Sequence, residues 1–142
     1  MFAGPRVLIV DDEERFRNTL RKLLAVSGVT ATAAGSGEEA LQELNKEAYD
    51  VILLDVKMPE MSGIEALAKI KKVAPGIEVI MLTGHACVDV AVEIMKLGGY
   101  EYLLKPCPLD DLMLKIDAAY ERKLAREGKS RQSVPTAKTI TQ

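Results

Sequence analysis

Continuous apolar segments alternate along this chain of 142 residues with segments whose apolar residues recur at helical spacing. Three of the apolar segments have the unbroken character of strands that helices cover on both faces of a parallel sheet. A fourth ends in Lys105-Pro106, and a fifth, Val29 to Ala33, is weaker. The strand candidates are residues 6–10, 29–33, 51–54, 79–82 and 100–104.

The segments between these strands predict amphipathic helices. The helix candidates are Glu13 to Ser27, Ser36 to about Asn45, a helix around Ile64 to Ile70, Val88 to Leu97, and Leu109 to Arg126. Gly28 is placed to cap the first helix. Ser36 and Glu39 have the spacing of a capping box at the start of the second. Alternating strands and helices indicate parallel pairing with right-handed crossovers, so we expect an α/β, doubly wound five-stranded parallel sheet.

The length suits one domain. We expect it to occupy residues 1–127, because residues 128–142 lack an apolar period and are rich in Ser, Thr and Lys. That composition is typical of a flexible C-terminal tail or linker.

Polar side chains follow four of the predicted strands. Asp11-Asp12 follows the first, Asp55 ends the third, Thr83 ends the fourth and Lys105 follows the fifth. Open α/β sheets place their chemistry at the carboxyl ends of the strands, where these residues would meet. Three acids, a hydroxyl and an amine at one edge indicate a cation site beside a nucleophile.

Each of these residues also has a purely structural interpretation. Asp11-Asp12 suits a solvated helix start, since acids favour helix N-termini. Asp55 also fits the cap of a turn, and Lys105 also fits an ordinary surface amine. Thr83, taken alone, does not distinguish a structural role from a functional one. His85 has no second ligand nearby in the sequence and is interpreted as a loop residue rather than a metal ligand.

Taken together and in order, the positions resemble the receiver domain of two-component response regulators, from Arg6 to about Arg126. The motifs that carry the resemblance are Val10-Asp11-Asp12-Glu13, Leu54-Asp55-Val56-Lys57-Met58-Pro59, Leu82-Thr83-Gly84 and Tyr102-Leu103-Leu104-Lys105-Pro106. The resemblance implies a flavodoxin-like (βα)5 fold with helices on both faces of the sheet. It also implies a signalling switch that promotes only its own phosphorylation and dephosphorylation, not a turnover enzyme.

The resemblance implies a role for each residue at this edge. Asp55 would accept a phosphoryl group from the phosphohistidine of a sensor histidine kinase or phosphotransfer protein. Lys105 would neutralise one phosphoryl oxygen as a compact charge, and Thr83 would hydrogen-bond another. Mg²⁺, which prefers oxygen ligands, would be held by Asp11, Asp12, Asp55 and the backbone carbonyl of Lys57.

Further family features are implied around the fifth strand. Tyr102 occupies the position of an aromatic switch residue, which would follow Thr83 when phosphate draws that hydroxyl inward. Lys105-Pro106 resembles a cis peptide bond of the family. Two positions depart from the common pattern of the family. Gly99 replaces an alanine, which we expect to loosen the entry to this strand. Cys107 replaces a phenylalanine, so a smaller side chain packs at that position.

The helix Val88 to Leu97 carries more apolar surface than one core-facing arc requires. Val88, Ala91, Val92 and Met95 form one apolar face, and Val90, Ile94 and Leu97 form another. The surplus predicts a surface for an output partner or a homodimer. The resemblance implies that the strand 100–104 and the helix 109–126 belong to the same surface. The alternative is a helix buried on all sides. The chain would act alone or as part of a larger regulator, for example of transcription.

Composition narrows the remaining choices. A net charge of -2 argues against direct nucleic-acid binding by this domain, and no apolar stretch reaches the roughly 18 residues of a membrane span. Cys87 and Cys107 lack metal-site spacing and indicate free thiols in a reducing, cytoplasmic setting.

Three alternative functions stay open at this point. An aspartate-nucleophile phosphatase would want a second acid two residues after Asp55, where Lys57 stands. A flavin-binding protein of the same fold would want a glycine-rich phosphate loop where the acids of the first strand lie. A receiver-like module that binds partners without phosphorylation agrees less well with the intact acids, Thr83 and Lys105.

Overall fold

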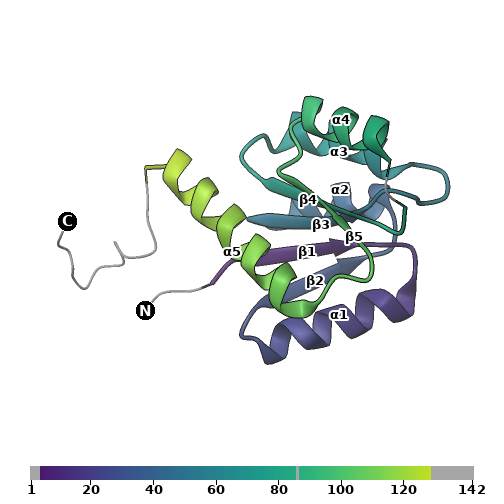
Figure 1. The fold of residues 1–142 in the computed structure, drawn as a ribbon. Coiled ribbons are helices and arrows are strands. Elements are labelled where there is room, and N and C mark those ends of the chain that lie inside the picture. Colours follow the sequence, from purple (N-terminus) through teal and green to yellow (C-terminus); the bar gives the residue numbers. More distant parts are fainter. Residues whose placement is uncertain (1–3, 86, 129–142) are drawn as a thin grey trace.

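The structure, a computed structural model, describes residues 4–85 and 87–128 (Figure 1). Strands and helices alternate through this part of the chain, and five parallel strands form one sheet in the order β2-β1-β3-β4-β5. The elements are β1 (Arg6–Val10), α1 (Glu14–Val26), β2 (Thr30–Ala34), α2 (Gly37–Lys46), β3 (Val51–Asp55), α3 (Gly63–Val73), β4 (Glu78–Thr83), α4 (Val88–Lys96), β5 (Glu101–Leu104) and α5 (Leu109–Arg126). The predicted fold class is confirmed.

The helix ends follow the local chemistry predicted for them, with one difference. The Ser36 hydroxyl accepts a hydrogen bond from the Glu39 N–H at 3.1 Å, which caps α2. The Glu39 carboxylate, however, accepts from the N–H of Gly35, so the reciprocal half of the capping box is displaced by one residue. Gly28, at φ +85°, donates to the Ala25 carbonyl and ends α1 as expected.

Helices cover both faces of the sheet, and the core has two halves. Alternate strand residues point to opposite faces, so burial on both faces requires the unbroken apolar segments seen in β1, β3 and β4. Helices α1 and α5 pack on one face, and α2, α3 and α4 on the other (Figure 1). Leu53 and Ile80 belong to the first half of the core, whereas Leu54 and Met81 belong to the second.

Helix α4 buries only one of its two apolar faces. Ile94 is completely buried and Val90 packs against the core. Val88, Val92 and Met95 are 78%, 46% and 45% exposed. The alternative of a helix buried on all sides is therefore wrong, and the second apolar face meets solvent in this chain.

Ion pairs hold the last turns of α5 against the amino ends of the strands, which we call the amino edge of the sheet. Glu78, the first residue of β4, is 1% exposed, and its carboxylate lies 2.7 Å from Arg126 and 3.5 Å from Arg122. Lys123 lies 3.2 Å from Asp50. Because a buried carboxylate is costly without a partner, these arginines fix the position of the helix.

Among the described residues, no helix combines the length and apolar character needed to cross a membrane. The tail or linker predicted at residues 128–142 lies outside the described residues except for Gly128.

Candidate functional site

The sheet brings the polar residues predicted from sequence to one edge. Asp11 follows β1, Asp55 ends β3, Thr83 ends β4 and Lys105 follows β5. These four strands are neighbours and run in the same direction, so their carboxyl ends meet.

The acids converge closely enough to hold one ion. One carboxylate oxygen from each of Asp11, Asp12 and Asp55 lies within 4.8 Å of the others. Asp11 and Asp55 are 2% and 7% exposed, and Asp12 is exposed. An all-oxygen donor set with an open, solvated side fits Mg²⁺, which keeps several of its waters; it does not suit thiophilic metals.

One ammonium group balances the two buried carboxylates. Lys105 Nζ lies 2.6 Å from Asp11 Oδ2 and 3.6 Å from Asp55 Oδ1. It also lies 4.2 Å from the centre of the Phe16 ring, within the range of a cation–π contact. Phe16 was not among the predicted site residues, because its helical spacing indicated only a core-facing position.

Asp11 is held in place from two directions. Its Oδ1 accepts a hydrogen bond from the Glu13 N–H at 2.9 Å. Its backbone carbonyl accepts one from the Arg17 guanidinium at 2.8 Å. A metal would therefore meet Asp11 in a preset orientation, which lowers the conformational entropy lost on binding.

The surroundings of Asp55 disfavour its charged form. Burial is the largest cause that raises the pKa of Asp55, and the charge of Asp11 adds to it. The ammonium of Lys105 and the backbone N–H of Lys57 act in the opposite direction, but the pKa stays raised. A cation among the three acids would offset this penalty. For the Lys57 carbonyl, the role of metal ligand stays a prediction.

Gly63, the first residue of α3, packs directly against the backbone of Asp55. A Cβ at this position would lie 2.0 Å from the Asp55 carbonyl oxygen and 2.8 Å from the Val56 Cα. The Gly63 N–H donates to the Val56 carbonyl at 2.8 Å. The sequence analysis did not identify Gly63; its only signal is a glycine directly after the helix-capping Ser62.

Two side chains tie the loop between β4 and α4 to the sheet. The Thr83 hydroxyl accepts a hydrogen bond from the His85 N–H at 3.2 Å. The Tyr102 hydroxyl donates to the His85 carbonyl at 2.8 Å and accepts from the Cys87 N–H at 3.1 Å. His85 is exposed and takes part through its backbone, which agrees with its interpretation as a loop residue.

Other expectations around β5 have mixed outcomes. The Lys105-Pro106 peptide bond is cis, as predicted, and both cysteines are free. The expectation that Gly99 loosens the entry to β5 is wrong. Gly99 is buried, and a Cβ there would lie 2.5 Å from Ile94 Cγ2, so the missing side chain permits close packing of the strand entry against α4.

Comparison with known proteins gives one consistent family. The family model for the response regulator receiver domain matches residues 7–117. The transcriptional regulatory protein ZraR of Escherichia coli strain K12 is 37% identical over 113 residues, which is 80% of this chain and 26% of that protein. The chain thus spans about a quarter of this curated relative.

Solved structures agree with the sequence match. A response regulator receiver domain protein from Clostridium thermocellum superposes with a TM-score of 0.79 at 38% identity, over 84% of this chain and 96% of that one. The beryllofluoride-activated NtrC4 receiver domain dimer superposes with a TM-score of 0.78, also at 38% identity, over 83% and 98% of the two chains.

Proposed function

Because this chain belongs to the response regulator receiver domain family, we propose that it is a phosphorylation-controlled switch with Asp55 as its phosphoacceptor. The observation that carries the proposal is the position of the Asp55 carboxylate. It ends the central strand β3, lies beside two further acids, and has the Lys105 ammonium 3.6 Å away. Such an arrangement supplies positioning and charge neutralisation, which are the main requirements of phosphoryl transfer.

In the proposed reaction, a carboxylate oxygen of Asp55 attacks the phosphorus of a phosphorylated histidine. The new O–P bond forms as the N–P bond breaks, and the electron pair of that bond stays on the donor nitrogen. Lys105 neutralises charge on a phosphoryl oxygen. Mg²⁺, held by Asp11, Asp12, Asp55 and the Lys57 carbonyl, would supply further neutralisation of phosphoryl charge when bound.

The signal would then pass through Thr83 and Tyr102. A phosphoryl oxygen on Asp55 competes with the His85 backbone for the Thr83 hydroxyl. Once Thr83 turns toward the phosphoryl group, the loop that Tyr102 also holds loses the hydrogen bond between the His85 N–H and the Thr83 hydroxyl. The ring of Tyr102 would follow, and the surface of α4, β5 and α5 would change.

The donor is proposed to be a sensor histidine kinase or a phosphotransfer protein, and residues 1–127 to be the unit that receives the phosphoryl group. The exposed face of α4 is proposed as the output surface, through which a second copy of the chain would bind. The similarity of the chain to the beryllofluoride-activated NtrC4 receiver domain dimer supports this choice. Control of transcription and a cytoplasmic location belong to the proposal as well, the first by analogy with ZraR.

Intact-mass measurement after incubation with acetyl phosphate and Mg²⁺ tests the proposal. We expect one phosphoryl group on the wild type and none on Asp55→Asn. Asp50→Asn is the matched control, because Asp50 is a half-buried acid at the opposite edge of the sheet; it should be labelled like the wild type. Labelling that survives Asp55→Asn would refute the assignment, and an absence of labelling with any donor would favour a module that works without phosphorylation.

A further inference from the structure

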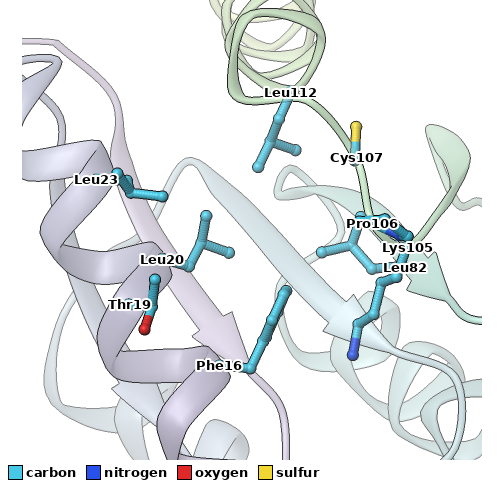
Figure 2. A pocket seen from close by; sticks show the side chains of 9 residues that line it. All are labelled: Phe16, Thr19, Leu20, Leu23, Leu82, Lys105, Pro106, Cys107 and Leu112. Carbon is cyan, nitrogen blue, oxygen red and sulfur yellow. The ribbon is translucent and has the colours of Figure 1, made fainter.

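A cavity of about 120 Å³ lies between α1 and the segment that joins β5 to α5 (Figure 2). Of the residues that line it, only Lys105 has a role in the phosphoryl transfer proposed above. Its walls are Phe16, Thr19, Leu20 and Leu23 from α1, Leu82 from β4, and Lys105, Pro106, Cys107 and Leu112.

Most of the lining is apolar, but the pocket opens to solvent, because Thr19, Leu23 and Pro106 also line it and are exposed. Leu20, Leu82 and Leu112 are buried. Burial raises the pKa of the Cys107 thiol, with the charge of Asp111 as a smaller cause, so this thiol stays protonated at neutral pH. Lys105 contributes the one charged group, and its ammonium is already paired with two carboxylates.

We propose that this cavity is a binding site for a small, neutral aromatic molecule. Apolar cavities of about 150 Å³ bind benzene, and this pocket, although it opens to solvent on one side, has a volume of the same order. A negative charge is disfavoured by the neighbouring acids, and a positive charge by Lys105 and the apolar walls. The Phe16 ring offers a stacking or edge contact, and the Cys107 sulfur offers a sulfur–aromatic contact.

Cys107 lines the cavity with a small side chain. Figure 2 shows its side chain across the space from the α1 side chains. A phenylalanine at this position would place a ring of the ligand's own size into the cavity. Cys107→Phe therefore tests the site by filling it. Cys87→Ser is the matched control, because Cys87 is exposed at the start of α4 and does not line the cavity.

Titration with fluorobenzene, followed by ¹⁹F NMR, measures binding directly. We expect saturable binding to the wild type and to Cys87→Ser, and loss of binding in Cys107→Phe. Benzoate, which adds a negative charge to the same ring, should bind at least about tenfold more weakly, a difference of about 1.4 kcal/mol. Labelling of Cys107→Phe by acetyl phosphate would show that this variant is folded.

A second measurement needs no substitution. At a fluorobenzene concentration about three times the measured Kd, alkylation of Cys107 by iodoacetamide should slow about fourfold, since one quarter of the protein is then free. The alkylation rate of Cys87 should not change. Absence of saturable binding, equal binding by Cys107→Phe, or unprotected Cys107 would overturn the proposal. A different pair of results would also overturn the proposal: the wild type does not bind fluorobenzene, and Cys107→Phe is labelled by acetyl phosphate but not by a protein phosphodonor. The cavity would then hold a side chain of that donor.

Discussion

Asp55→Asn removes a buried charge and preserves the shape of the side chain, and we expect it to stabilise the metal-free domain. Carboxylate oxygens of Asp55 and Asp11 lie within 4.8 Å of each other, which corresponds to a repulsion of at least about 3.5 kcal/mol at an effective dielectric constant near 20. Lys105 lies 3.6 Å from Asp55, an attraction of about 4.6 kcal/mol on the same scale. The exposed Asp12 adds less than about 1 kcal/mol of repulsion.

These pairwise interactions nearly cancel. The cost of burying the Asp55 charge therefore decides whether Asp55→Asn raises or lowers the free energy of unfolding. That cost is several kcal/mol for a fully buried ion, and Asp55 keeps some contact with water. We expect the substitution to raise the free energy of unfolding by about 1–2 kcal/mol at neutral pH. Lys105 is not left unpaired, because Asp11 lies 2.6 Å away.

The effect should depend on pH in a defined direction. Since the pKa of Asp55 is raised above its ordinary value of 3.8 in the folded protein, the folded state binds this proton more tightly than the unfolded state. Wild-type stability from this group therefore falls as pH rises from about 3.8 through the folded pKa. The advantage of Asp55→Asn should therefore be larger at pH 7 than at pH 4.

Urea unfolding with a chelator present, from pH 7 to pH 4 at constant ionic strength, measures this difference. Millimolar Mg²⁺ should raise the midpoint of the wild type, since a ligand that binds only the folded state stabilises it, and should have little effect on Asp55→Asn. Asp50→Asn should lose stability, because Asp50 pairs with Lys123 and accepts the Arg6 N–H. A less stable Asp55→Asn at pH 7, or an advantage that does not vary with pH, would refute the reasoning.

Three further predictions concern other parts of the domain. Val92→Asp on the exposed face of α4 should abolish any beryllofluoride-induced dimer in sedimentation experiments without unfolding the protein; an unchanged dimer would place the interface elsewhere. Glu78→Gln should lower the free energy of unfolding by about 0.5–1 kcal/mol, because it removes the charge that pairs with Arg126 and Arg122, whose own side chains are 43% and 51% exposed and stay solvated, and a neutral result in urea unfolding would contradict the ion-pair account. Gly63→Ala should cost about 1–3 kcal/mol and slow labelling by acetyl phosphate, since its Cβ displaces the Asp55 backbone; wild-type labelling would show that α3 adjusts freely.

The sequence was sufficient to predict the strands and the edge where the site lies. Unbroken apolar segments identify buried strands. In a parallel sheet all strands run in the same direction, so their carboxyl ends lie side by side. Asp11, Asp55 and Lys105 could therefore be assigned to one place before their distances were known. The resemblance to a family then distinguished a metal and phosphoryl site from three unrelated polar strand ends.

Contacts that depend on depth of packing were not predictable in this way. Helical spacing showed that Phe16 faces inward but not that Lys105 crosses its ring. Gly63 and Gly99 carry no side-chain pattern. Their roles follow from the close approach of the Asp55 backbone to Gly63 and of the Ile94 side chain to Gly99, which only the packed structure defines. Glu78 was not considered, because the apolar segment begins one residue later, and its arginine partners lie 44 and 48 residues away in α5.

The two edges of the sheet also differ in how their buried charge is balanced. At the amino edge, two guanidinium groups surround the single carboxylate of Glu78. At the carboxyl edge, Asp11 and Asp55 share one ammonium, and Asp12 adds a third negative charge. This asymmetry produces an electric field directed along the strands. The field should draw cations to the open edge before any ligand bond forms, so the association rate of Mg²⁺ should fall with ionic strength.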